Sequence, residues 1–278
     1  MRLNAHTSEK IAKLVIWGAA IFVLTVLIGI IIYILAKGLP AINWPFLTEN
    51  PRNMGRSGGV ASTIVGTMML AALAILIAAP FGIGTAFYLA EYTRESLATR
   101  IIRFSAESLA AIPSIVYGLF GFIFFVIYLD LGWSILSGGL TLAIMILPTV
   151  IRTSEEAILA VPRMYREVSF SLGGTKLQTI LYAVYPSAIR GITNGIILSI
   201  GRSVAETAAV ILTAGSALRM PSSIFSPTRS MAVHFYILAR EGISMENAYG
   251  TAALLIIIIF LINVVANMLV DRFVAKER

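Results

Sequence analysis

Cysteine is absent from the 278 residues of the chain, and charged residues make up only 13% of them. Without cysteine the chain forms no disulfide and carries no thiolate chemistry. A soluble globular domain has about 25% charged residues, so this scarcity of charge indicates an integral membrane protein. Histidine is nearly absent too. The two present, His6 and His234, are far apart in the sequence and both are predicted to lie in loops, so no metal site is expected.

Two further patterns are missing. No GxxxxGK[ST] motif occurs, so we do not expect this chain to bind ATP through a phosphate-binding loop. Serine, aspartate and histidine show no arrangement typical of an activated nucleophile. The sequence therefore predicts a protein that is not an enzyme and binds no cofactor of its own.

What the chain has in abundance is apolar length. Hydrophobic residues make up 58% of it, and the mean hydropathy is +0.88. An α-helical span needs about 20 apolar residues. Six stretches qualify, which predicts an all-α integral membrane protein with six transmembrane helices at roughly 14–36, 62–90, 108–129, 134–151, 190–214 and 248–270. The first is too long for a signal-peptide core and is expected to be retained.

Proline and glycine mark the interruptions in this pattern. Pro80 and Pro113 are expected to kink the second and third spans, because proline removes a helix hydrogen bond. The connection 38–59 is rich in proline and glycine and is predicted to be a loop. The connection 215–247 is the longest outer loop, with an irregular PSSIFSPTRS segment.

The distribution of positive charge predicts the orientation. With the N-terminus inside, 14 of the 21 lysines and arginines fall in cytosolic segments and six in outer loops. Because lysine and arginine concentrate on the cytosolic side, both termini are predicted to be cytosolic. The same count explains the net charge of +7 without invoking nucleic acid.

One cytosolic segment, Arg163 to Pro186, is basic and amphipathic rather than apolar. Gly173 and Gly174 favour a turn in its middle. Apolar residues repeat at helical spacing on both sides of that turn: Met164, Tyr165, Val168 and Leu172 before it, and Leu177, Ile180, Leu181 and Val184 after it. The segment is predicted to be a helical hairpin. From the pattern alone it could lie on the membrane surface or bind a partner protein.

The fifth span carries charge within the membrane. Arg202 and Glu206 are four residues apart and are predicted to share a helix face. Ser199, Ser203 and Thr207 lie on or beside the same stripe. A charge in the bilayer costs roughly 2.5–3.5 kcal/mol on insertion scales, so it should face the bundle interior. The pair either locks helices together or forms a polar path for an anion, and the two roles are compatible.

Arg152 follows Pro148 in the fourth span and is a second candidate for an anion path. It could equally anchor the cytosolic end of that span, with Glu155 or Glu156 nearby. Glu107 is expected to pair with Arg103 at i, i+4.

The hairpin resembles a known signature. Glu167, Gly173 and Pro186 have the spacing E-x5-G-x12-P, similar to the cytosolic EAA motif of type I ABC importer permeases, which reads E-A-A-x3-G-x9-I-x-L-P. Val168 and Ser169 replace the two alanines, and Ala183 and Tyr185 replace the isoleucine and leucine. The resemblance implies that Glu167, Gly173, Gly174 and Pro186 couple the chain to an ATPase subunit.

Five further segments resemble the permeases of the phosphate ABC importer, and more closely the PstA type than the PstC type. They are GGVASTIVGTMML (58–70), FYLAEY (87–92), IPSIVYGLFGF (112–122), LPTVIRTSEEAI (147–158) and IGRSVAET (200–207), followed by SMAVHFYILAREG. The resemblance implies phosphate as cargo and Arg202 and Glu206 as the intramembrane charged pair. It also implies a PstC-type second permease, a PstB-type ATPase dimer that binds ATP and magnesium, and a PstS-type external binding protein.

The resemblance also divides the chain. The expected parts are residues 1–57 (tail, first span and outer loop), the importer transmembrane domain 58–272 with its coupling hairpin 163–186, and a cytosolic tail 273–278. Two alternatives remain at this point. One is a permease for another oxyanion, such as phosphonate, sulfate or molybdate. The other is a stand-alone secondary anion transporter, which would not require the cytosolic hairpin.

Overall fold

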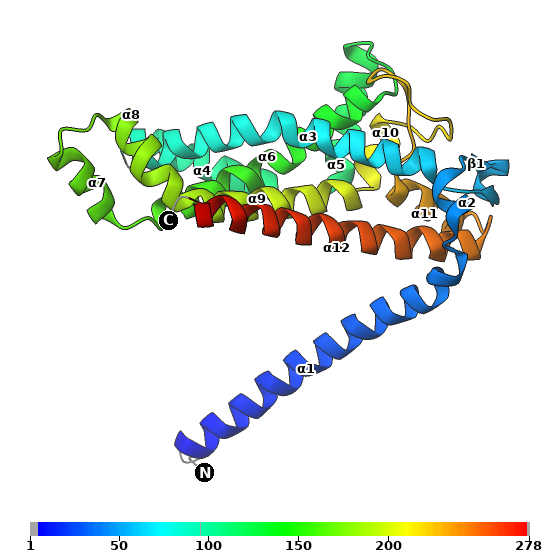
Figure 1. Cartoon of the computed structure of the whole chain (residues 1–278), viewed down its shortest axis with the longest axis horizontal. Helices are drawn as coiled ribbons and strands as arrows, with labels where there is room; N and C mark the ends of the chain where they lie inside the picture. Colours follow the sequence, from blue (N-terminus) through cyan, green and yellow to red (C-terminus); the bar gives the residue numbers. More distant parts are fainter. Residues whose placement is uncertain (1–4, 95, 277–278) are drawn as a thin grey trace.

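The computed structural model describes residues 5–94 and 96–276. The main body is a bundle of long helices lying side by side (Figure 1): α3 (Ala61–Phe87), α6 (Ile135–Leu159), α9 (Tyr185–Ala205) and α12 (Met245–Lys276). Shorter helices complete it: α4 (Leu97–Ala110), α5 (Ser114–Gly121), α10 (Ala208–Thr213) and α11 (Met231–Arg240). The predicted helical membrane fold is confirmed.

The first helix leaves this body. α1 (Ala5–Gly38) contacts α12 only near its end, and the rest of it extends away from the bundle (Figure 1). At the crossing point Gly38 lies directly against the Tyr249 carbonyl, where a side chain would not fit. No residue in the most apolar stretch of α1 is buried within the chain.

The core lies where α3 crosses α6. Leu70, Ala74 and Ala78 of α3 pack with Leu142 and Ile146 of α6 in its largest cluster. Small residues bring the two helices close, as expected for membrane helix pairs. A Cβ on Gly82 would lie 2.7 Å from Val150 Cγ1, and one on Gly139 would lie 2.5 Å from Leu73 Cδ2. The two helices are therefore closely packed against each other.

The number of spans differs from the simple count. In the described residues four helices, beginning at Ala12, Ala61, Ile135 and Met245, are long and apolar enough to cross a membrane. A fifth span arises if the bent pair Leu97–Ala110 and Ser114–Tyr128 is counted as one. The count of six stays a prediction, because α9 with its two arginines does not meet the same criterion.

The predicted span 108–129 is wrong in its first part. Residues 108–110 belong to α4, and the chain turns by 98° before α5 and its π-helical continuation η4 (Phe122–Tyr128). Pro113 explains the break because it precedes α5 and has no N–H to continue α4. Pro80, by contrast, lies within an unbroken α3.

The two predicted loops contain more structure than expected. Segment 38–59 holds the turn η1 (Leu39–Ala41), the helix α2 (Trp44–Thr48), a second turn η2 (Asn53–Gly55) and a small antiparallel sheet of β1 (Pro51–Arg52) and β2 (Ser57–Gly58). The PSSIFSPTRS segment is irregular as predicted, but α11 follows it. His6 lies in α1 and His234 in α11, so the prediction that both lie in loops is wrong.

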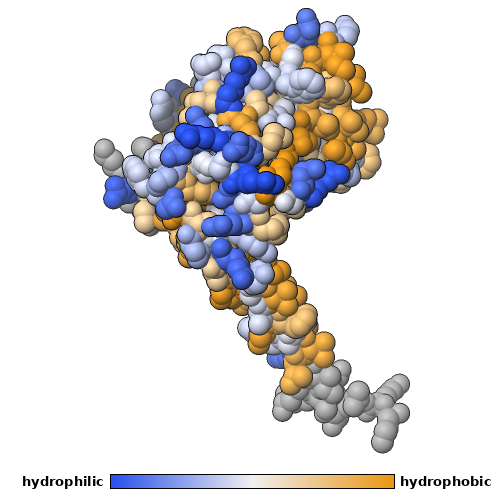
Figure 2. All heavy atoms as spheres, turned by 90° about the vertical axis from the view of Figure 1, so that its right-hand side faces the viewer, coloured by the Kyte–Doolittle hydropathy of each residue, from blue (hydrophilic) through white to orange (hydrophobic). Residues whose placement is uncertain are grey.

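Hydrophilic side chains gather at the end of the bundle formed by α2, β1, β2 and the start of α12, with apolar side chains along the flanks (Figure 2). Exposed Arg52, Arg56 and Arg240 belong to this end. The opposite end carries the segment 163–186 (Figure 1). The body therefore has two polar ends separated by apolar length, as a multi-pass membrane protein requires.

Candidate functional site

Arg202 lies at the end of α9, where the helix breaks. α9 stops at Ala205, Glu206 has extended backbone angles (φ −73°, ψ 130°), and α10 begins at Ala208. The half-buried Arg202 guanidinium donates through Nη1 to Thr149 Oγ1 of α6 at 3.5 Å. The sequence therefore places a cation beside a break in the helix, where backbone groups are also freed.

The prediction that Arg202 and Glu206 share a helix face is wrong. The Glu206 carboxylate accepts the N–H of Ala209 through Oε1 at 3.2 Å, which caps the first turn of α10. This hydrogen bond satisfies a backbone N–H that has no partner within the helix, and the negative charge is favourable at a helix N-terminus. Within the described residues no ion pair joins the two side chains, so Arg202 keeps donors free for another acceptor.

The three hydroxyl residues of the predicted stripe differ in their surroundings. Ser199 and Ser203 are buried and donate to the carbonyls of Gly195 (2.9 Å) and Ser199 (3.0 Å) within α9. Thr207 is half-buried at the helix break. Both serine hydroxyl groups donate to carbonyls of α9. Among the residues of this stripe, the Arg202 side chain is therefore the one that offers several hydrogen-bond donors.

Arg152 lines a cleft of about 200 Å³ between α4 and α6. It is 59% exposed and pairs with Glu156 at 3.0 Å and with Glu107 at 4.0 Å. The predicted Glu107–Arg103 pair is therefore wrong, since Arg103 pairs instead with Glu155 at 2.8 Å. Thr149, the partner of Arg202, lies one turn before Arg152 on α6.

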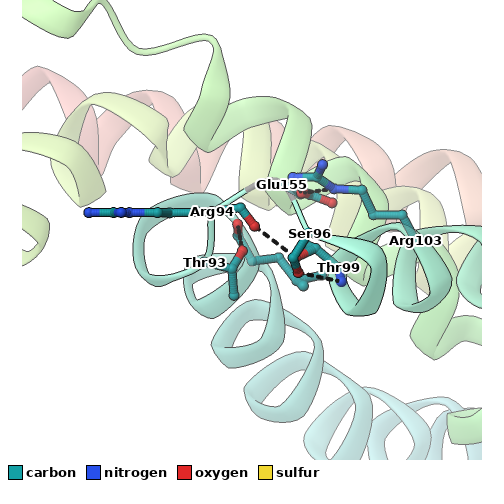
Figure 3. A network of polar contacts seen from close by, with 7 residues as sticks. Thr93, Arg94, Ser96, Thr99, Arg103 and Glu155 are labelled. Carbon is teal, nitrogen blue, oxygen red and sulfur yellow. Dashed lines mark hydrogen bonds and ion pairs between the residues drawn. The ribbon is translucent and has the colours of Figure 1, made fainter.

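Figure 3 shows how the polar side of α4 is held against α6. Ser96 caps α4 by accepting the N–H of Thr99 at 3.3 Å, and the Thr99 hydroxyl donates to the Arg94 carbonyl at 2.9 Å. Arg103, two turns from that cap, reaches across to Glu155 of α6, whose side chain is nearly buried. The Arg94 side chain points away from this group (Figure 3).

The hairpin forms as predicted. α7 (Arg163–Ser171) is followed by Gly173 in a left-handed conformation (φ 81°), which glycine adopts without steric cost. Thr175 and Gln178 then form a capping box that starts α8 (Lys176–Thr179). The π-helical turn η5 (Ile180–Val184) joins α8 directly to α9, with Pro186 in its first turn.

The two apolar faces of the hairpin have different environments. Met164, Tyr165, Val168 and Leu172 of the first face are all exposed. On the second face, Val184 packs in a cluster with residues of the bundle and Ile180 is buried, whereas Leu177 and Leu181 are exposed. A groove of about 440 Å³ lies between α7 and the start of α9, and the exposed Glu167 lies on the same helix. Such a groove suits a protein partner.

Tyr117 and Thr149 are neighbours of the site that the pattern did not single out. The Tyr117 hydroxyl donates to the Leu109 carbonyl at 2.8 Å, across the bend between α4 and α5. Both residues occur within motifs that carried the resemblance, IPSIVYGLFGF and LPTVIRTSEEAI. A buried tyrosine needs a hydrogen-bond partner, and that requirement is the signal that could have found it.

Comparison with known proteins agrees with this geometry. Residues 78–278 match the model of the "binding-protein-dependent transport system inner membrane component" family. The chain belongs to this family. The predicted type I ABC importer permease is thereby confirmed, and with it a multi-pass membrane protein that acts as a transport subunit rather than an enzyme.

Relatives cover nearly the full length. The probable ABC transporter permease protein YqgI of Bacillus subtilis is 30% identical over 96% of each chain. The phosphate transport system permease protein PstA of Xylella fastidiosa is 34% identical over 86% of this chain and 84% of that one. PstC of Pasteurella multocida is 31% identical over 99% of this chain and 96% of that one. Two kinds of related permease thus exist.

Solved structures share the fold. A bacterial alginate ABC transporter, in complex with an alginate-bound periplasmic protein, contains a chain with a TM-score of 0.69 and 13% identity, covering 96% of each chain. The likeness to that chain shows a shared fold. The permease family also implies partnership with an ATPase.

Proposed function

We propose that this chain is a permease subunit of an ATP-driven importer of inorganic phosphate, of the PstA type, and forms half of the translocation path. One observation carries the proposal: the half-buried Arg202, at the break between α9 and α10, retains guanidinium donors in a chain whose relatives include PstA proteins at 34% identity. The cargo is assigned from those relatives and from the chemistry of this group.

The guanidinium group suits a tetrahedral oxyanion. It is planar, always charged, and presents paired N–H donors that match two oxygens of a phosphate. In a site of low dielectric constant the attraction is stronger than in water. Thr149 holds one Arg202 nitrogen from α6, and Glu206 lies four residues beyond Arg202 without neutralising it. Ser199, Ser203, Thr207 and Arg152 complete the proposed path as its polar lining.

The proposed assembly has four kinds of component. A PstC-type permease supplies the other half of the path, and a PstS-type protein delivers phosphate outside the membrane. A PstB-type ATPase dimer binds ATP and magnesium and docks on the hairpin 163–186 through Glu167, Gly173, Gly174 and Pro186. Both termini of this chain are then cytosolic, as the excess of lysine and arginine on that side supports.

Binding of ATP to the partner would move the hairpin, and the bundle would change between two arrangements that expose Arg202 to opposite sides. Permeases for phosphonate, sulfate or molybdate would use the same guanidinium chemistry. A secondary transporter working alone would have no use for the exposed apolar groove between α7 and α9. Co-purification of a soluble ATPase with the chain separates that last alternative from the importer.

The test is Arg202→Gln in the assembled transporter, measured as phosphate uptake into vesicles that contain the binding protein. A hydrogen bond to a charged group contributes about 1.5–3 kcal/mol, so uptake should fall about 10- to 150-fold. The matched control is Arg219→Gln, which removes an exposed arginine from the outer loop. Uptake at the wild-type rate in an assembled Arg202→Gln transporter would refute the role of Arg202. Stronger competition by sulfate, phosphonate or molybdate than by phosphate would refute the cargo.

A further inference from the structure

The first helix of the hairpin has few means of holding its angle to the bundle. α7 contains no fully buried residue, and both of its neighbouring surfaces are hollow. One side faces the groove toward α9, and the other faces a cleft of about 390 Å³ toward the ends of α3 and α6. Hydrophobic packing therefore does not fix α7, since the apolar side chains it offers are exposed.

In the part of the chain that the structure describes, one side chain of α7 forms hydrogen bonds across the second cleft. Arg166, in the middle of α7, donates to Glu91 Oε1 through Nε at 2.9 Å and through Nη2 at 2.6 Å. The same guanidinium donates to the carbonyls of Val161 (2.8 Å) and Ile158 (3.0 Å) at the end of α6. Four hydrogen bonds thus converge on one residue.

The surroundings make this contact specific for arginine. The side chains of Arg166 and Glu91 are 18% and 9% exposed, so water competes weakly for either charge. The two carbonyls lie in the last turn of α6 and just beyond its end, where a positive charge is favourable. A lysine could supply the charge but not the planar fork that reaches the carboxylate and two carbonyls together.

The contact joins α7 to helices other than α8, which follows it in the chain. Glu91 belongs to η3 (Tyr88–Tyr92), the π-helical continuation of α3, and Ile158 belongs to α6. These are the two helices whose close packing forms the core. α6 also carries Thr149, which holds Arg202. Through Arg166, a displacement of α7 therefore reaches the helix beside the proposed anion path without passing through the glycine turn.

We propose that Arg166 and Glu91 form a positioning link that fixes the angle of α7 and transmits its displacement to the α3–α6 pair. This extends the proposed function in one respect: it rests on the ATPase subunits being what displaces α7. The geometric part of the proposal is independent of the cargo and of the ATPase.

The geometric part can be measured directly because the chain has no cysteine of its own. Spin labels on Ser171→Cys in α7 and Tyr88→Cys in η3, both exposed positions, report the distance between the two elements. We expect a narrow distance distribution in the otherwise wild-type chain, within the complex reconstituted in lipid and without nucleotide or phosphate.

Arg166→Gln and Glu91→Gln should each broaden this distribution, and the double variant should broaden it no further, because both residues act through one contact. Arg166→Lys should give an intermediate width. The matched control is Arg163→Gln, which removes an exposed arginine from the first turn of the same helix and should leave the width unchanged. An unchanged distribution in both single variants, or equal broadening by Arg163→Gln, would overturn the link.

The transmission part is tested by the ratio of ATP hydrolysed to phosphate taken up. We expect this ratio to rise several-fold in Arg166→Gln and Glu91→Gln while both variants remain assembled. A broadened distance with an unchanged ratio would overturn transmission and leave only a structural contact. Should the wild-type complex take up no phosphate, the proposed cargo fails, while the distance result still decides the link.

Discussion

Acidification should loosen the end of the bundle that carries α11, through one buried histidine. His234 lies in α11, outside the membrane-spanning helices, and is almost completely buried. Arg229, also buried, donates to the Ser216 carbonyl (3.0 Å) through Nε and to His234 Nδ1 (3.4 Å) through Nη1. Because arginine only donates, Nδ1 is the acceptor and the imidazole is neutral.

The size of the effect follows from the pKa. Burial, and secondarily the positive charge of Arg229, lower the pKa of His234 from 6.5 to about 4. The folded state therefore binds the proton more weakly than the unfolded state does. The stability of the fold with a neutral His234 is therefore fully present above pH 6.5, and it is lost as the pH falls toward 4 and the unfolded state takes up the proton. The loss is about 2 kcal/mol at pH 5 and about 3 kcal/mol below pH 4.

Hydrogen exchange of the α11 amides, resolved by mass spectrometry, measures this opening free energy. After correction for the intrinsic pH dependence of exchange, the wild-type chain should lose about 2 kcal/mol between pH 7.5 and pH 5. His234→Gln should be less stable at pH 7.5 but should lack this slope, whereas His6→Gln, at the other histidine, should retain it. Parallel slopes in the wild type and His234→Gln would refute the reasoning.

Two further predictions concern glycines. In Gly195→Ala the new Cβ would overlap the Thr153 hydroxyl of α6, so the purified chain should lose about 1–3 kcal/mol of stability against thermal unfolding. Thr153→Ala in the same chain should restore part of this loss, because it removes the hydroxyl but leaves the Thr153 Cβ 2.7 Å from the new one. No restoration would show that the contact with the hydroxyl is not the cause. Gly173→Val forces a branched residue to φ 81°, a strain of about 1–2 kcal/mol, and should uncouple ATP hydrolysis from phosphate uptake. Glu167→Lys should have the same effect, and Gly173→Asn should have a milder one. Full uptake by Gly173→Val would contradict the coupling role of the turn.

The hairpin could be predicted because its determinants are local. Gly173 requires a left-handed conformation at the turn, and apolar residues repeat at helical spacing on both sides. Two elements that were missed carried local signals as well. Asn43 caps α2, which has Pro45 in its first turn, and Ser230 caps α11 by accepting the N–H of Val233. The density of proline and glycine around them favoured a loop.

The charged pair of the fifth span shows where spacing alone misleads. An interval of four residues places two side chains on one face only if the helix is continuous between them. Glu206 removes that condition by accepting a backbone N–H three residues ahead. The Arg166–Glu91 contact is beyond prediction for a different reason: its partners are 75 residues apart, and no local pattern relates them.

The hairpin is connected to the bundle by the chain at both ends, from α6 into α7 and from η5 into α9, and also by the Arg166 side chain. The covalent connection from α8 to α9 passes through η5, where the regular α-helical hydrogen-bond pattern is interrupted, as it often is at functional sites. A displacement carried by this route alone would be partly absorbed before reaching Arg202. The link through Arg166 avoids η5 and displaces α6, whose Thr149 contacts the same guanidinium. Because α9 ends at Ala205, the segment beyond the break can stay in place while α6 and α9 shift beside it. The route through η5 acts on Arg202 from α9, and the route through Arg166 acts on it from α6. This arrangement favours a change in the exposure of Arg202 over a rigid translation of the bundle.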